Sequence, residues 1–153
     1  MKIIKSVDKK IVVKLKKFDP TEFFKNREGL YVWSSFKDNI LDKAKTIEKE
    51  SEFKISSYDL VKFGNDEEIE KELPEKHLFS ETDVCALIAS LIEKQPKGEE
   101  GTLQNNGYAN LFYTSSHVVV VRWSGGEWSV YDWYRRDGRW GGGPRVFAPA
   151  TES

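Results

Sequence analysis

The feature that most constrains the fold is an almost continuous strand signal in the last third of the chain. Three runs rich in β-branched and aromatic residues, Tyr108–Tyr113, His117–Trp123 and Trp128–Tyr134, are separated by short polar or glycine-containing segments. The pair Gly125-Gly126, between the second and third runs, is typical of a two-residue hairpin turn. We therefore predict a three-stranded meander, with a fourth strand over Arg145–Ala148.

The two-residue turn also fixes which residues of the hairpin face each other. It places Trp123 opposite Trp128 and Val119 opposite Asp132, with His117 farther along the same face. Both faces of this hairpin are largely apolar. Because strands that are apolar on both faces are buried on both faces, we expect the hairpin near the middle of the sheet and most of its aromatic rings in the core.

The clearest helix signal precedes this meander. Ser80 is a good N-cap, Glu81 and Asp83 follow in the first turn, and apolar residues keep helical spacing up to about Lys94, before Pro96 ends the helix. Small residues within this helix allow close packing. We therefore predict the α+β class, in which an antiparallel sheet with a C-terminal β-meander packs against this buried central helix and a few short helices.

The first half of the chain carries weaker signals. Lys10–Lys16 alternates like a half-buried strand, and its lysines are typical of a sheet edge. Shorter patterns predict a helix from Asp19, a strand at Leu30–Trp33, a helix up to about Lys45, β structure over Phe53–Phe63 and a helix from Asn65. The acidic first turn of the last of these, with Asp66, Glu67, Glu68 and Glu70, is interpreted as a solvated face.

Length and composition fit a single domain over residues 1–153. We divide it into an α/β part over 1–63, a helical part over 64–95 and the β-meander over 102–149. Hydrophobic residues make up 39% of the chain and aromatic residues 13%, which excludes a disordered protein. The net charge of -1 gives no field that would draw the whole molecule to nucleic acid or an anionic membrane.

Cysteine and histidine usage narrows the chemistry further. Cys85 is the only cysteine, so a disulfide within the chain and a thiolate zinc site are excluded, and a cytoplasmic location is expected. The longest apolar run is the nine residues Val84 to Ile92, well short of the roughly 20 that cross a bilayer. With two histidines and no phosphate-binding glycine motif, we expect no metal site and no cofactor.

Cationic residues are strongly partitioned along the chain, and this partition points to a binding surface. All eighteen lysines precede position 98, whereas five of the six arginines and four of the five tryptophans follow position 121. Guanidinium groups stack on aromatic rings and match the geometry of carboxylates and phosphates. The candidate ligand-binding residues are Arg135, Arg136, Arg139, Trp140 and Arg145.

We therefore interpret the chain as a non-enzymatic binding or interaction module with an Arg/Trp/Gly-rich C-terminal recognition surface. Its partner would be an unidentified protein or a small anionic or aromatic ligand. Nucleic acid is not expected, because the net charge after residue 116 is only +1. The alternative, that these arginines form internal ion pairs with Glu127, Asp132 and Asp137, stays open.

A second hypothesis starts from Cys85, His117 and Asp132. A thiol nucleophile needs a base, and that base needs an acceptor that orients it. The order of a cysteine on a helix, a histidine on a strand and an aspartate on the next strand resembles papain-like cysteine hydrolases, in particular peptidases that cleave double-glycine leaders. The resemblance implies a Cys-His-Asp catalytic constellation. A structural thiol between Val84 and Ile88 is the other interpretation of Cys85.

A further resemblance covers most of the chain but carries no mechanism. The segments that carry it are Cys85–Leu91, Asn105–Tyr113, Trp128–Trp133, Arg136–Trp140 and Arg145–Pro149. They are similar to small hypothetical proteins of unknown function from uncultivated candidate-phylum bacteria. This similarity implies a bacterial origin and a shared fold.

Overall fold

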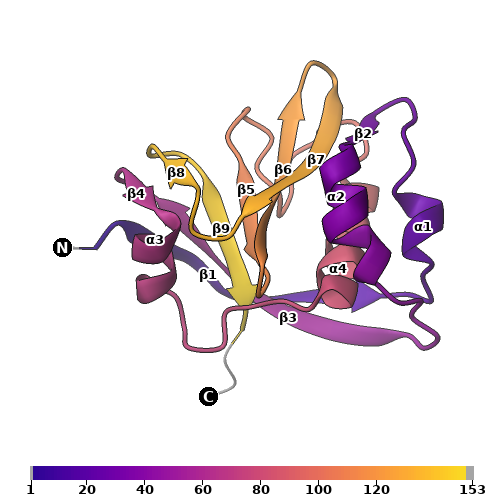
Figure 1. The fold of residues 1–153 in the computed structure, drawn as a ribbon, viewed down its shortest axis with the longest axis horizontal. Coiled ribbons are helices and arrows are strands. Elements are labelled where there is room, and N and C mark those ends of the chain that lie inside the picture. The colour runs from indigo at the N-terminus through magenta and orange to yellow at the C-terminus, as the bar shows by residue number, and fades with distance from the viewer. Residues whose placement is uncertain (1, 151–153) are drawn as a thin grey trace.

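The structure is a computed structural model that describes residues 2–150, and it places helices on both sides of a large sheet (Figure 1). The helices are α1 (Pro20–Phe23), α2 (Ser34–Asn39), a 3-10 turn (Leu41–Lys43), α3 (Asp66–Glu72) and α4 (Glu81–Lys94). The strands are β1 (Ile4–Leu15), β2 (Leu30–Val32), β3 (Ser51–Leu60), β4 (Gly64–Asn65), β5 (Asn110–Tyr113), β6 (His117–Ser124), β7 (Glu127–Tyr134), β8 (Arg139–Trp140) and β9 (Arg145–Pro149). The predicted α+β class is confirmed.

Seven strands form the main sheet in the order β1-β3-β9-β5-β6-β7-β2, and β4 pairs with β8 in a separate small sheet. The lysine-rich strand β1 lies at an edge, as predicted. Most neighbours run antiparallel, but β9 is parallel to β5 and β2 is parallel to β7. The sheet is therefore mixed, and not antiparallel throughout. Strand direction depends on the path of the connections, which the alternation of side chains does not encode.

The meander β5-β6-β7 has the register that the sequence predicts. Trp123 pairs with Trp128, and Val119 pairs with Asp132. The two glycines of the connecting turn have φ of +64° and +82°, as a hairpin turn that follows the twist of its strands requires. Local turn chemistry therefore sets the alignment of the central hairpin.

Burial along the hairpin agrees with the prediction only in part. Val118 to Val121 of β6 are completely buried, with both faces covered. At the end of β7, however, Trp133 is 53% exposed and Tyr134 is 65% exposed. The short edge strand β2 pairs only with residues 128–130 of β7, so no strand flanks the end of β7 on that side. The expectation that most of the hairpin's aromatic rings belong to the core is wrong for these two.

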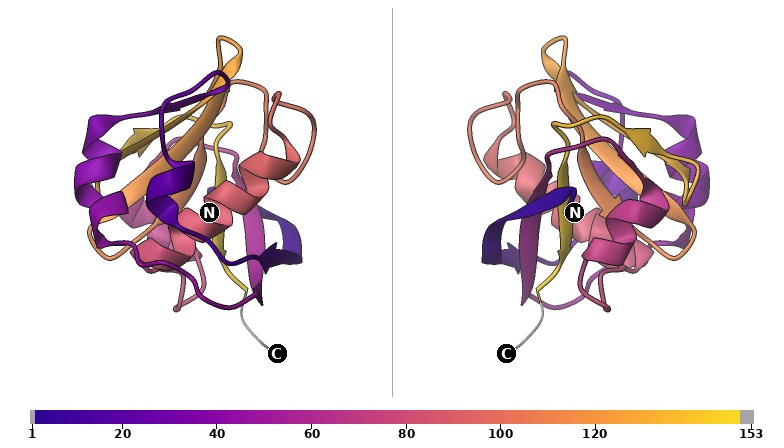
Figure 2. Two further views of the ribbon diagram at one scale, coloured as in Figure 1. Left: turned by 90° about the vertical axis from the view of Figure 1, so that its right-hand side faces the viewer. Right: turned by 90° about the vertical axis from the view of Figure 1, so that its left-hand side faces the viewer.

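One face of the main sheet is covered by α4 together with α1, α2 and the 3-10 turn (Figure 2). Ser80 caps α4, and its hydroxyl accepts a hydrogen bond of 3.1 Å from the amide of Asp83. At the other end of the helix, the indole of the fully buried Trp128 donates to the carbonyl of Gln95 over 2.6 Å. The predicted packing of the meander on this helix is thus fixed by a polar contact as well as by apolar burial.

The opposite face of the sheet has a second, smaller core. It lies under α3 and the β4-β8 pair, on the left in Figure 1. Its buried members include Leu60, Ile69, Leu111, Val120 and Val146. Two covering layers on one sheet explain why β6 is apolar on both faces.

The loop after α4 gives a test of this packing. Gly98 has φ of +71°, and a Cβ there would overlap the ring of Trp123, whereas Gly107 has φ of +88° with nothing within 4 Å of its Cβ position. We expect Gly98→Ala to lower the free energy of unfolding by about 2–5 kcal/mol and Gly107→Ala by about 1–2 kcal/mol, because only the first adds overpacking to backbone strain. Urea denaturation measures both, and equal losses would contradict the packing of Trp123 on Gly98.

Candidate functional site

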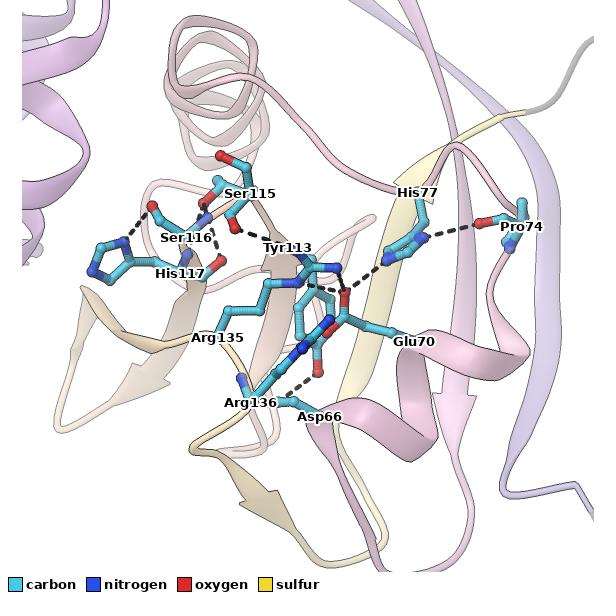
Figure 3. A network of polar contacts seen from close by, with 11 residues as sticks. Asp66, Glu70, Pro74, His77, Tyr113, Ser115, Ser116, His117, Arg135 and Arg136 are labelled. Carbon is cyan, nitrogen blue, oxygen red and sulfur yellow. Dashed lines mark hydrogen bonds and ion pairs between the residues drawn. The ribbon is translucent and has the colours of Figure 1, made fainter.

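A buried carboxylate organises the segment that follows β7, residues 135–140, which includes β8 and which we call the arginine loop (Figure 3). Asp66, the first residue of α3, accepts hydrogen bonds from the backbone amides of Arg136 at 3.0 Å and Gly138 at 2.7 Å. It also accepts from the indole of Trp140 at 2.8 Å and the hydroxyl of Tyr113 at 2.7 Å. Four donors on one fully buried carboxylate compensate for its lost hydration and fix the loop from inside.

The Tyr113 hydroxyl is suited to this role. Burial first, and the neighbouring Asp66 carboxylate second, raise the pKa of Tyr113 above its ordinary value. The phenol therefore stays protonated and donates its hydrogen bond throughout the physiological pH range.

Glu70 lies one helical turn beyond Asp66 and holds the start of the same loop. Its Oε1 atom lies 2.7 Å from Nη2 and 2.8 Å from Nε of Arg135, and 2.8 Å from Nε2 of His77 (Figure 3). The Glu70 side chain is only 8% exposed. The expectation of a solvated acidic face is therefore wrong for Asp66 and Glu70, because the face of α3 that carries Ile69 packs on the sheet.

Two of the five predicted ligand-binding residues are held in internal ion pairs. Arg135 pairs with Glu70 at 2.7 Å, and Arg145 pairs with Asp59 at 2.9 Å. Both arginine side chains are 21% exposed. Their partners come from α3 and β3, and not from the acids of the C-terminal third. These two guanidinium groups support the scaffold.

The other arginines of the loop face solvent. Arg136 and Arg139 are exposed, and no ion pair among residues 2–150 involves either of them. Arg136 has φ of +80°, a conformation that costs free energy for a residue with a side chain and that the Asp66 contact maintains. Trp140 is half-buried beside them, with its indole turned inward.

Exposed aromatic rings adjoin the arginine loop. Trp133 and Tyr134 end β7 directly before it. Farther back, the rings of Trp33 and Tyr131 lie 5.0 Å apart between centroids, and Tyr31 lies 6.5 Å from Trp33. Tyr31 and Trp33 are 45% and 46% exposed. Side chains alternate along a strand, so Trp133 shares a face of β7 with Tyr131, whereas Tyr134 points to the other face, where its ring centroid lies 4.9 Å from that of His117. Large exposed aromatic side chains are typical of binding surfaces.

The predicted pair of His117 and Asp132 is in contact, with 3.7 Å between Nε2 and Oδ2. This separation is too long for a hydrogen bond. Asp132 Oδ2 instead accepts from the amide of Asn39 at 3.1 Å, and the Ser116 hydroxyl lies 2.7 Å from Nδ1 of His117. His117 Nε2 and Asp132 Oδ1 are buried and have no hydrogen-bond partner within the described part of the chain.

The thiol of Cys85 lacks the properties of a catalytic nucleophile. Its thiol is fully buried in the core under α4, and no hydrogen bond from residues 2–150 reaches it. Burial first, and the nearby Glu81 carboxylate second, raise the pKa of Cys85 to about 12. A thiol with that pKa stays neutral near pH 7 and is a poor nucleophile.

Nowhere in residues 2–150 do three or more His, Cys, Asp or Glu side chains gather so that they could hold a metal ion. None of the helices in this range is long and apolar enough to cross a membrane.

Comparison of the chain with models of known protein families finds no match. Curated proteins and solved structures likewise give none. The two resemblances stated from the sequence therefore stay predictions, and the functional interpretation depends on the site itself.

Sequence reasoning missed the residues that organise the loop. Asp66 and Glu70 are spaced by four positions around the buried Ile69, and this helical spacing is the signal that placed them on an inward face. Asn39 carried no comparable signal, because its contact with Asp132 spans 93 positions of the chain. Tyr31 and Trp33 were expected in a strand, but nothing local showed that their rings lie on an open face.

Replacement of the buried carboxylate tests its role. In Asp66→Asn the new amide donor would face backbone N–H groups, so we expect a loss of about 3 kcal/mol in the free energy of unfolding and faster amide exchange at Gly138. Asp137→Asn is the matched control, since Asp137 is exposed in the same loop, and its effect should stay within about 0.5 kcal/mol. Similar losses in the two variants would contradict the anchoring role of Asp66.

The state of the thiol gives a second test. Since the fold raises the Cys85 pKa from 9.0 to about 12, it favours the neutral thiol; this stabilisation is complete below pH 9.0 and is lost as pH rises towards 12. We expect iodoacetamide to leave the native protein unlabelled near pH 8 and to alkylate it after unfolding, as measured by mass spectrometry. Rapid alkylation of the folded protein would instead identify an activated thiolate.

Proposed function

We propose that this protein is a non-enzymatic binding module whose recognition surface consists of Trp133, Arg136 and Arg139, with Tyr134 at its border. The observation that carries the proposal is the anchoring of the arginine loop by the buried Asp66, while the side chains of Arg136 and Arg139 remain exposed. A loop that is already ordered loses little conformational entropy when it binds. Maintaining a positive φ at Arg136 has a cost that a purely structural turn would avoid with glycine.

The chemistry of this surface defines the class of ligand. Guanidinium groups donate paired hydrogen bonds to phosphate or carboxylate, and exposed indole and phenol rings stack on planar groups. The partner is therefore a small ligand or a protein side chain that combines an anionic group with a planar ring. A binding groove for nucleic acid would need more positive charge than the C-terminal third carries.

The setting of the module follows from the sequence predictions. The single buried cysteine supports a reducing, cytoplasmic compartment. The resemblance to hypothetical proteins of candidate-phylum bacteria supports a bacterial origin.

A cysteine hydrolase is the second candidate function, and one observation favours it. His117 and Asp132 lie side by side, with 3.7 Å between Nε2 and Oδ2, as a base and its neighbouring acid would, but no hydrogen bond joins them. The raised pKa of Cys85 speaks against it, because the reaction requires a thiolate at neutral pH. The alkylation experiment above separates the two functions.

Phenyl phosphate, which carries both a ring and a phosphate, is the probe that tests the binding function. We expect it to shift the indole signal of Trp133 in ¹H–¹⁵N NMR spectra and to leave that of the buried Trp128 unchanged. Arg136→Ala/Arg139→Ala should weaken binding about tenfold or more. The affinity of Arg136→Lys/Arg139→Lys for phenyl phosphate should lie between that of the unchanged protein and that of the Ala variant. Lysine keeps the positive charge but lacks the planar guanidinium group.

The control for this series is Lys49→Ala/Lys76→Ala, which removes two exposed positive charges outside the recognition surface. It should bind phenyl phosphate as the unchanged protein does. If the Trp133 signal does not respond, or if the Ala and control variants bind alike, the proposed recognition surface is wrong.

A further inference from the structure

A second surface lies at the opposite end of the main sheet from β7. β1 is the terminal strand and is twelve residues long, and within residues 2–150 its only strand neighbour is β3. Among residues 2–150, side chains bond to the β1 backbone only near its ends, where Glu72 accepts from the amide of Ile4 and Ser90 donates to the carbonyl of Lys14. Residues 5–13 therefore present an open backbone edge, which is interrupted by register shifts between Ser6 and Asp8 and between Asp8 and Ile11 and is regular from Ile11 onward. An open edge is a template for an added strand.

The side chains along this edge are strongly cationic. Residues 2–17 contain seven lysines against the single acid Asp8, a net charge of +6. All seven lysines are exposed, and the one ion pair that any of them makes within residues 2–150, Lys16 with Glu93, is long at 3.9 Å. A surface ion pair of this kind contributes little to stability, so these lysines remain available to a partner.

The positive charge continues beyond the strand. A groove of about 320 Å³ lies between α4 and the segment at the C-terminal end of β1. Phe18, Ala86 and Ser90 line it together with four lysines and one glutamate: Lys14, Lys16, Lys17, Lys94 and Glu93. The edge and the groove thus form one cationic track with apolar patches.

We propose that the outer edge of β1 binds an extended acidic peptide, which joins the main sheet as an additional strand. Backbone hydrogen bonds to residues 5–13 would hold the peptide, and its acidic side chains would face the lysines. Because side chains alternate along a strand, every second residue of the peptide would lie beside Lys10 and Lys14, and the others would extend the apolar layer of Ile11 and Val13.

The positive charge and the open strand edge of the track together favour one class of binding partner over the others. Pairing of β1 with β1 of a second copy would bring two sets of seven lysines together, so self-association at this edge is opposed. The phosphates of a nucleic acid would pair with the lysines, but a nucleic acid would not form strand hydrogen bonds with the open edge or contact the exposed Val7 and Val12 through apolar side chains. An acidic peptide with alternating apolar residues matches both features.

This binding surface is independent of the recognition surface around the arginine loop. The two lie near opposite edges of the sheet order, β1 at one end and β7 next to the other. Arg136→Ala/Arg139→Ala should therefore leave peptide binding at β1 unchanged. Failure of one proposal does not affect the other.

The experiment uses the full chain and an acetylated peptide of alternating Glu and Val, about ten residues long to match the open edge. We expect saturable binding by calorimetry, weakened by added salt, and increased amide protection of residues 5–13 in hydrogen exchange. Lys10→Glu/Lys14→Glu should weaken binding about tenfold or more, whereas the matched control Lys43→Glu/Lys49→Glu, also exposed, should change it less than about twofold.

Three results would overturn the proposal. The first is binding of the acidic peptide without added protection of the β1 amides, which would indicate contact elsewhere or mere charge attraction. The second is equal binding of an alternating Lys and Val peptide, or no binding of either peptide. The third is tighter binding of single-stranded oligothymidylate than of the acidic peptide, which would make the track a nucleic-acid surface.

Discussion

The structure depends on one constraint: the central hairpin is apolar on both faces and must be covered twice. The buried valines of β6 leave no solvated side, so a second layer has to lie opposite the helices α1, α2 and α4. That layer consists of α3 and the short β4-β8 pair, which are too small to form a core of their own. Burial of Ile69 against Val120 and Val146 therefore has to be combined with polar contacts that hold the layer in place.

Asp66 and Glu70 supply those contacts, and they connect the fold to the site. Each carboxylate is removed from water, and each receives several donors from the β7-β8 connection or its surroundings. An unpaired buried carboxylate would be costly, so the loop and α3 are ordered together. One consequence is that Arg135 turns inward, while Arg136 and Arg139 stay at the surface. The contacts that attach α3 to the arginine loop therefore also leave Arg136 and Arg139 exposed.

Exposed arginines and exposed lysines lie on different parts of the surface. The arginines gather where a planar fork and aromatic rings are useful, beside Trp133 and Tyr134. The lysines gather along β1, where flexible point charges keep an open edge from pairing with its own kind. This division is consistent with the two partners proposed above, a ring-bearing anion at the arginine loop and an acidic strand at β1.

The sequence by itself determined the elements whose signals are local. The Ser80-capped helix, the register of Trp123 with Trp128 and the lysine-guarded edge strand all follow from caps, turn residues and side-chain period, which act over a few positions. Tertiary structure alone decided which carboxylates are buried, which arginines are exposed and which strands run parallel. Asp66 meets the amide of Arg136 across 70 positions of the chain, and the spacing of residues does not show which distant donor a carboxylate will find. His117 and Asp132 are the opposite case, because the register of the hairpin predicted that they lie on one face. The neutrality of the Cys85 thiol, by contrast, depends on burial by the whole core.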